Sequence, residues 1–432
     1  MTGRRLSTLL ASVTAAAAGA SLLTGCGVLP GATGGSREPV TVMTWAPDQT
    51  RATNMPGMPA MAQTFARWVN SQGGIDGHEL RVLTCNEQNT PTGAASCARR
   101  AVREKAVAVV GSYSQNGRAF MAPLEAAGIP YIGGYGITED EFTSSLSYPV
   151  NGGLAALLAG HGMQLAEDCD KVSLVRPDTL AGDRLPKLLD AGLKRASKRG
   201  AVDIPAVEDA TEYTSQAARA RDKAGTEDGC VAAVLGERTQ TFFDSFRRLP
   251  EPTGGARSDD SGPGSGSGGS PIRISSVLGS VGQPVIDRTG GARSPFEGAY
   301  VTGWYPEADD KSWGPMREVV KEHAFADNRV DPTDTGVQTT WIAYTVLKQV
   351  IESLDTDVIT SARITQALDH GARVDTGGLT PPLRWMYEDL LGAPDFPRIV
   401  NHEVTFQVVR EGRLVAQKPG FVDIGPTVTN RG

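Results

Sequence analysis

Short apolar runs alternate with longer amphipathic segments along the first part of the chain. The runs, together with one stretch of alternating polar and apolar residues, predict strands at residues 40–45, 78–84, 106–110 and 130–132. Apolar residues at helical spacing predict helices at residues 58–70, 94–104 and 120–127. Because successive parallel strands need a crossover connection, this order predicts a parallel sheet with helices on both faces.

The same pattern restarts near residue 152 and predicts a second unit of this kind. Helices are predicted at residues 153–165, 185–197 and 239–249, and strands at residues 172–175, 231–235 and 272–278. The fold class is therefore α/β, with two doubly wound parallel-sheet lobes. Residues 251–270 interrupt the second lobe with a polar segment rich in glycine and serine, which is predicted to be a disordered surface insertion.

The last part of the chain adds one strand, three helices and a hairpin to this prediction. The strand is predicted at residues 299–304, and the helices at residues 315–325, 335–354 and 361–368. Residues 404–410 alternate, and Glu411, Gly412 and Arg413 separate them from the short apolar stretch 414–416. Two such stretches around a short glycine-containing turn are typical of a β-hairpin.

The N-terminus carries an export signal. Arg4 and Arg5 precede an almost wholly apolar run at residues 9–23, which is shorter than a membrane-spanning helix requires. The sequence Leu-Thr-Gly-Cys that ends at Cys26 resembles the bacterial lipobox. That resemblance implies a signal peptide at residues 1–25, acylation of Cys26 and a flexible tether at residues 26–39. The alternative is an ordinary signal peptide with an incidental cysteine.

Four further cysteines follow Cys26. An even number in an exported chain favours disulfides, for which three pairings are possible. We prefer Cys85–Cys97, which closes a short local loop, and Cys169–Cys230, which precedes two strands that could be neighbours in a parallel sheet. A metal site would need closely spaced cysteines or histidines, and this pattern is not present in the sequence.

Charge and motifs exclude several classes of function. The formal net charge is −7 and no basic stripe stands out, so a nucleic-acid partner is not expected. The five histidines are scattered, and no nucleophile motif, phosphate-binding loop, zinc signature or complete dinucleotide motif occurs. We therefore expect a protein that is not an enzyme, with no catalytic residues, no bound metal and no cofactor.

Three stretches carry a resemblance to a known family. In the first, Asn70 is followed by Gly73, Gly74, Ile75 and Gly77, and a strand comes next. The others are residues 107–112 with 128–132, and the closing hairpin. Together they resemble the periplasmic-binding-protein type I family, in its leucine/isoleucine/valine-binding branch.

The resemblance implies two discontinuous lobes. Residues 40–151 plus 299–398 would form the first lobe, and residues 152–298 plus 399–432 the second. Three crossover strands would join the lobes as a hinge. The ligand would lie in the cleft between the lobes, near the carboxyl ends of the strands, where open α/β sheets bind ligands.

Candidate ligand-binding residues follow from the same resemblance. Ser112, Ser114, Gln115 and Asn116 would offer hydroxyl, amide and backbone donors to a ligand carboxylate. Tyr135 would stack over the ligand, and Ile137 stands where the family has a hydroxyl. In the second lobe, Leu180 and Ala181 replace an aromatic residue, Glu237 would receive an ammonium group or Arg238 a carboxylate, and Gly279 lies in a loop that lacks the family's acidic residue.

These expectations describe a monomeric lipoprotein on the outer face of the cell membrane. It would capture a small polar ligand between its lobes, for example an amino acid or a related compound, and deliver it to the permease of an ABC transporter. The alternative is a lipoprotein of the same fold that senses a ligand and reports it to a membrane receptor or kinase.

Overall fold

The computed structural model describes residues 37–429 except residues 52, 180, 226–227, 251–271, 355 and 394. The predicted signal peptide, the acylated Cys26 and the insertion at 251–270 lie outside the described residues. The predicted tether is partly wrong, because its last three residues begin the first strand. Arg37 pairs with His78 in the sheet and forms an ion pair with Asp76, which holds this end of the strand in place.

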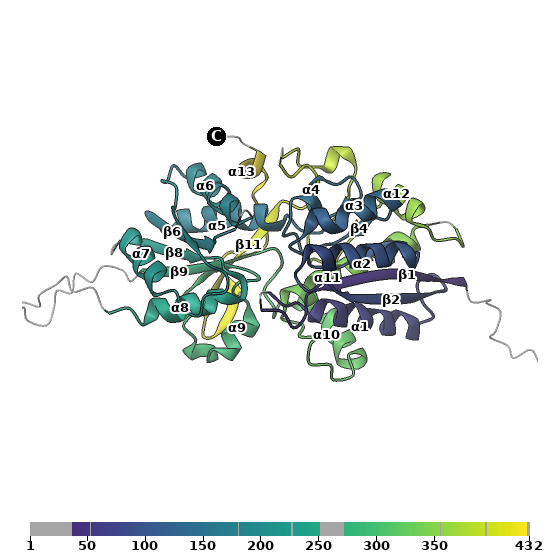
Figure 1. Ribbon diagram of the computed structural model, residues 1–432, viewed down its shortest axis with the longest axis horizontal. Helices are drawn as coiled ribbons and strands as arrows, with labels where there is room; N and C mark the ends of the chain where they lie inside the picture. Colours follow the sequence, from purple (N-terminus) through teal and green to yellow (C-terminus); the bar gives the residue numbers. More distant parts are fainter. Residues whose placement is uncertain are drawn as a thin grey trace, which may run out of the picture. The chain divides into compact units, whose positions relative to one another are not determined.

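The first sheet is wholly parallel and has the order β2-β1-β3-β4-β5. Its strands are β1 (Arg37–Ala46), β2 (His78–Asn86), β3 (Ala108–Val110), β4 (Tyr131–Ile132) and β5 (Ser147–Tyr148). Helices cover both of its faces, as Figure 1 shows. Because side chains alternate along a strand, Val42 and Val110 pack on one side, whereas Met43 and Val109 pack on the other.

The helices of this sheet divide accordingly. The side of Val42 is covered by α1 (Gly57–Ser71), α10 (Gly314–His323), α11 (Thr335–Glu352) and α12 (Ser361–Asp369). The side of Met43 is covered by α2 (Pro91–Arg103) and α3 (Gly117–Ala127), and the short α4 (Asp140–Thr143) contacts α3 and β5. Burial on both sides explains why the inner strands β3 and β4 are continuous apolar runs, whereas the edge strand β2 alternates.

The second sheet is mixed and has the order β12-β11-β10-β9-β8-β6-β7, with β13 paired to β11. Its strands are β6 (Lys171–Pro177), β7 (Val202–Ala206), β8 (Gly229–Ala233), β9 (Arg273–Val277), β10 (Tyr300–Gly303), β11 (Glu403–Arg410), β12 (Arg413–Ala416) and β13 (Val422–Asp423). β6 to β10 are parallel, and the predicted hairpin is confirmed as antiparallel β11 and β12.

Two sets of helices cover this second sheet (Figure 1). On one side lie α5 (Gly153–Ala166) and α6 (Leu185–Arg195), which contact α13 (Gly425–Thr429). On the other side lie α7 (Thr214–Ala224), α8 (Thr239–Arg247) and α9 (Gln283–Arg288). The predicted α/β class with two doubly wound sheets is confirmed, although the sequence prediction lacked β5, β7, β13, α4, α7, α9 and α13.

One strand lies in a different sheet from the one expected. The boundary predicted at residue 299 places β10 with the first lobe, but β10 pairs with β9 and β11 in the second sheet. Tyr300, Val301 and Thr302 each align with a residue of β9. The chain therefore leaves the second sheet only after Gly303, where β10 ends. The other lobe boundaries stay a prediction.

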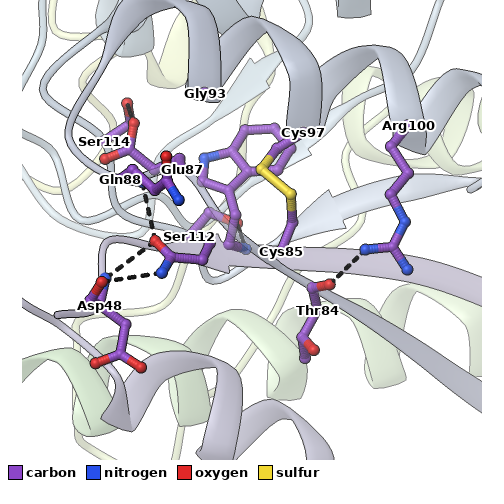
Figure 2. Close-up of a disulfide and its surroundings, with 12 residues drawn as sticks. Asp48, Thr84, Cys85, Glu87, Gln88, Gly93, Cys97, Arg100, Ser112 and Ser114 are labelled. Carbon is purple, nitrogen blue, oxygen red and sulfur yellow. Dashed lines mark hydrogen bonds between the residues drawn. A yellow bond between two sulfur atoms is a disulfide. The ribbon is translucent and has the colours of Figure 1, made fainter.

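Both predicted disulfides are present. Cys169 and Cys230 join the start of β6 to β8, and these two strands are neighbours in the parallel sheet, as expected. Cys85 and Cys97 join the end of β2 to α2 (Figure 2). One disulfide therefore joins two neighbouring strands, and the other joins a strand to a helix that packs on its sheet.

Candidate ligand-binding site

A cavity of about 800 Å³ lies among loops that follow the strands of both sheets. From the first sheet it receives the loops after β1, β3 and β4, and from the second sheet those after β6, β8, β9 and β10. All of these strands are parallel within their sheets, so their carboxyl ends gather at one edge of each sheet. Such an edge is where open α/β sheets bind ligands, and the volume suits a small molecule.

The loop after β3 brings two of the four predicted residues to the cavity. Gln115 and Asn116 line it, together with Tyr113. Ser112 and Ser114 are buried and are held by other groups. The Ser112 Oγ accepts the Trp45 backbone N–H at 3.0 Å, and the Ser114 Oγ donates to Glu87 at 2.9 Å. Side chains alternate along this extended segment, which turns the two serines inward.

The loop after β4 places Tyr135 and Ile137 on the cavity, and their contact with a ligand stays a prediction. Thr138 also lines the cavity and was missed. Its signal was present in the sequence, because the hydroxyl expected at Ile137 is supplied by the next residue. Beneath the loop, the Glu141 carboxylate accepts the backbone N–H groups of Gly136, Ile137 and Thr138 at 2.9–3.1 Å.

Three aromatic side chains form one wall of the cavity. Tyr135 lies edge-on to Tyr113 and to Trp304, with 5.2 Å between ring centroids in each pair. Burial raises the pKa of Tyr135 well above its ordinary value. Its hydroxyl lies near Thr335 but makes no hydrogen bond of ordinary geometry with any described residue. A buried polar atom of this kind is available to a ligand.

Gly279 is where this tyrosine meets the second sheet. A Cβ atom at Gly279 would lie 2.4 Å from the Tyr135 Oη, and the glycine has a φ of +91°. Gly279 lines the cavity, and a larger residue there would collide with the phenol. This contact joins the loop after β4 to the loop after β9.

The wall formed by the second sheet is mainly aliphatic. It consists of Leu154, Pro177, Ala181, Leu185, Leu188, Val234, Leu235, Val277 and Leu278, with polar groups at Thr179 and Ser280. Ala181 is where the sequence places it, whereas Leu180 lies outside the described residues. Most of this wall was missed, since the leucines after β6 read as ordinary helix core.

Glu237 and Arg238 are not among the described residues that line the cavity. The Glu237 Oε1 instead accepts the backbone N–H of Asn54 at 3.2 Å. Within the short 3-10 helix Gly236–Arg238, only Gly236 lines the cavity. The ammonium partner proposed from the sequence therefore lies elsewhere, beside the first sheet.

Charged side chains that line the cavity were not anticipated. They are Arg118, Glu139, Asp140, Arg184 and Glu208. Arg184, which follows β6, forms an ion pair with Glu139, which follows β4, and both are about half exposed. Burial and the neighbouring Asp209 raise the pKa of Glu208. Among the described residues, no group of three or more acidic, histidine or cysteine side chains could hold a metal ion.

Comparison with solved structures reveals the same fold at low sequence identity. A substrate-binding periplasmic protein from Ralstonia solanacearum aligns with a TM-score of 0.67 and 15% identity, over 88% of this chain and 100% of that one. A fatty acid ABC transporter substrate-binding protein from Thermomonospora curvata aligns at 0.68 and 12%, over 91% and 95%. A branched-chain amino acid ABC transporter protein from Thermus thermophilus with bound valine aligns at 0.69 and 14%, over 90% and 97%.

Sequence comparison gives a more direct result. No curated protein matches the chain significantly. Residues 50–249, however, match the profile of the family described as periplasmic binding protein. In the part of the chain that the structure describes, none of the helices has the length and apolar character needed to cross a membrane. The profile match over residues 50–249 and the shared two-sheet fold make this chain similar to periplasmic binding proteins, and the solved structures with this fold are solute-binding proteins.

Proposed function

We propose that this protein captures a small molecule in the cavity between its two sheets. The observation that carries the proposal is the convergence of loops from the carboxyl ends of both sheets on one cavity of about 800 Å³. A ligand held there would contact both sheets at once. Such contacts stabilise a closed arrangement of the lobes, since a ligand shifts a conformational equilibrium by its differential affinity for the two states.

The ligand that fits these walls has an apolar body and a polar end. The aliphatic wall of the second sheet matches the body, and Gln115, Thr138 and Tyr135 match the polar end. The structural relatives include one named for fatty acids and one with bound valine, so this fold accommodates both kinds of ligand. An amino acid with a large apolar side chain belongs to the proposed class, but its ammonium group would need a partner other than Glu237.

We also propose that the protein delivers its ligand to an ABC transporter permease. Two of the structural relatives carry ABC transporter names, which supports this role. Acylation of Cys26 would hold the protein at the outer face of the membrane, within reach of a permease. The Cys26→Ser variant should then be released from the membrane fraction into the soluble extract. Retention of that variant in the membrane fraction would contradict the anchor.

Mass spectrometry of small molecules released by denaturation of the purified protein tests the capture role. We expect one predominant compound with an apolar body at close to one copy per chain. The Ala181→Trp variant should lose the compound, because the indole would fill the cavity beside Ala181. Lys187→Trp is the matched control, since Lys187 is exposed on α6 away from the cavity lining. Equal retention by both variants would contradict the proposed site.

A further inference from the structure

Two buried glutamates lie directly beneath the two loops of the first sheet that line the cavity. We propose that Glu87 and Glu141 are positioning residues, each of which holds one of these loops in its binding conformation. The inference rests on the proposed function of the cavity and extends it to residues that do not touch the ligand. Neither glutamate is among the cavity-lining residues described.

Glu141 organises the loop that carries Tyr135. Its Oε1 accepts the backbone N–H groups of Ile137 and Thr138 at 3.0 and 2.9 Å, and also the Thr138 hydroxyl at 3.1 Å. Its Oε2 accepts the Gly136 N–H at 3.1 Å. Three consecutive amides of a loop that lines the cavity are thereby satisfied by one carboxylate, which fixes the backbone of this loop.

The approach of Glu141 to this loop leaves no space for a side chain at Gly134. A Cβ atom there would lie 2.1 Å from the Glu141 Oε2. The carboxylate is therefore packed against the loop as well as hydrogen-bonded to it. Burial raises the pKa of the Glu141 carboxyl, so keeping an acid at this place has a cost. A cost of this kind is offset when the group fixes a conformation that binding requires.

Glu87 organises the loop after β3 in a similar way. Its Oε2 accepts the Ser114 hydroxyl at 2.9 Å and the Asn116 side-chain amide at 3.4 Å. Asn116 lines the cavity, and its own backbone N–H donates to the Ser114 Oγ at 3.0 Å. The glutamate thus fixes Ser114, and Ser114 in turn fixes the residue that faces the ligand.

The position of Glu87 is itself fixed by its surroundings. It stands two residues after Cys85, whose disulfide to Cys97 ties this turn to α2 (Figure 2). A Cβ atom at Gly93 would lie 2.0 Å from the Glu87 backbone oxygen, so α2 begins in direct contact with this turn. The disulfide and the glycine together hold the carboxylate against Ser114.

The two loops are also joined to each other. The Tyr131 hydroxyl, from β4, donates to the Ser112 backbone oxygen at 3.1 Å. Burial, together with the charges of Glu141 and Glu87, raises the pKa of Tyr131. Displacement of one loop would therefore disturb the other, and each glutamate supports the same binding surface.

Hydrogen–deuterium exchange of the full mature protein tests the positioning role directly. In Glu141→Gln, the amide nitrogen replaces one acceptor oxygen, and we expect faster exchange at residues 136–138. In Glu87→Gln, we expect faster exchange at residues 114–116. The matched control is Glu297→Gln, since Glu297 accepts the N–H groups of Glu411 and Gly412 in the distant β11–β12 turn. That control should change exchange only at its own turn.

Binding of the fluorescent dye 8-anilinonaphthalene-1-sulfonate links the loops to the cavity. We expect the Kd of the dye to rise about tenfold in both loop variants and to stay within about twofold in the control. Unchanged exchange at residues 114–116 and 136–138 would overturn the positioning role. Faster exchange with an unchanged Kd would overturn the link to binding. Failure of the unmodified protein to bind the dye would count against the proposed apolar cavity, while the exchange data would still decide the positioning role.

Discussion

At the scale of single residues, polar groups buried against the second sheet form hydrogen bonds with one another. His161, on α5, lies 3.0 Å from the Thr302 hydroxyl through Nδ1 and 3.1 Å from the Ser275 hydroxyl through Nε2. The Thr302 hydroxyl donates to the Gln164 Oε1 at 2.7 Å, so it accepts from Nδ1. Burial lowers the pKa of His161 from 6.5 to about 4, so the imidazole of the folded protein is neutral near pH 7.

The neutral state of His161 predicts a loss of stability in acid. The unfolded chain takes up a proton below its ordinary pKa of 6.5, whereas the folded chain does so only near pH 4. Stability is therefore fully present above pH 6.5 and falls as the pH drops toward 4. Between pH 7.5 and pH 5 this group should lower the free energy of unfolding by about 2 kcal/mol.

Urea unfolding at the two pH values provides the measurement. The His161→Gln variant should lose about 2 kcal/mol less on acidification than the unmodified protein, because its amide does not titrate. An identical pH dependence in the two proteins would mean that folding does not lower the pKa of His161.

The contact between Gly279 and Tyr135 predicts a second effect at this scale. Gly279→Ala should lower the free energy of unfolding by about 3 kcal/mol, from collision with the phenol and from the positive φ. Tyr135→Phe alone should cost less than about 1 kcal/mol, since its hydroxyl has no described partner of ordinary geometry.

The double variant separates the two causes. Adding Tyr135→Phe to Gly279→Ala should restore about 1 to 2 kcal/mol in chemical denaturation, because the collision is relieved while the backbone strain remains. Additive effects of the two substitutions would show that the phenol does not approach this loop.

At the scale of helices and strands, the two disulfides close loops of different length. Cys169 and Cys230 are separated by 61 residues, and Cys85 and Cys97 by 12. Replacing the first pair by serine should lower the free energy of unfolding by about 4 kcal/mol, and replacing the second pair by about 3 kcal/mol, as the longer loop loses more chain entropy. Denaturant midpoints of the two double variants check the order, and the reverse order would indicate strain or residual structure in the unfolded chain.

At the scale of the whole molecule, an ion pair joins loops of the two sheets at the cavity. Arg184 and Glu139 are both half exposed, so the pair is worth at most about 1 kcal/mol. Glu139→Gln should shift the protein toward an open arrangement by up to about fivefold, visible as a larger radius of gyration in small-angle scattering at low salt. High salt should abolish the difference, because it screens exposed charges.

A surface pair of comparable exposure serves as the control for this prediction. Glu352 pairs with Lys348 at 2.6 Å within α11, away from the cavity lining described. Glu352→Gln should leave the radius of gyration unchanged at every salt concentration. If both substitutions change the radius of gyration equally, or if neither changes it, the Arg184–Glu139 pair does not influence closure.

Local patterns in the sequence were sufficient to predict most elements and both disulfides. Apolar periodicity predicted α1, α5 and α11, because a helix or strand must bury one face whatever its partner is. The family resemblance, rather than periodicity, named Tyr135 and Ile137 as candidates, and both line the cavity after β4. Sequence also indicated that Cys169 and Cys230 precede neighbouring strands.

Only the tertiary structure decided which side chains meet across long separations in the chain. Ser114 turns away from the cavity toward Glu87, 27 residues earlier, and Glu237 meets Asn54, 183 residues earlier. The strand β10 joined the second sheet because its hydrogen-bonding partners lie there. The periodicity of a segment determines which face it buries, but a buried polar group takes its partner from whatever the fold brings within hydrogen-bonding distance. The elements of this protein were therefore readable from its sequence, whereas the chemistry of its cavity depended on contacts between distant segments.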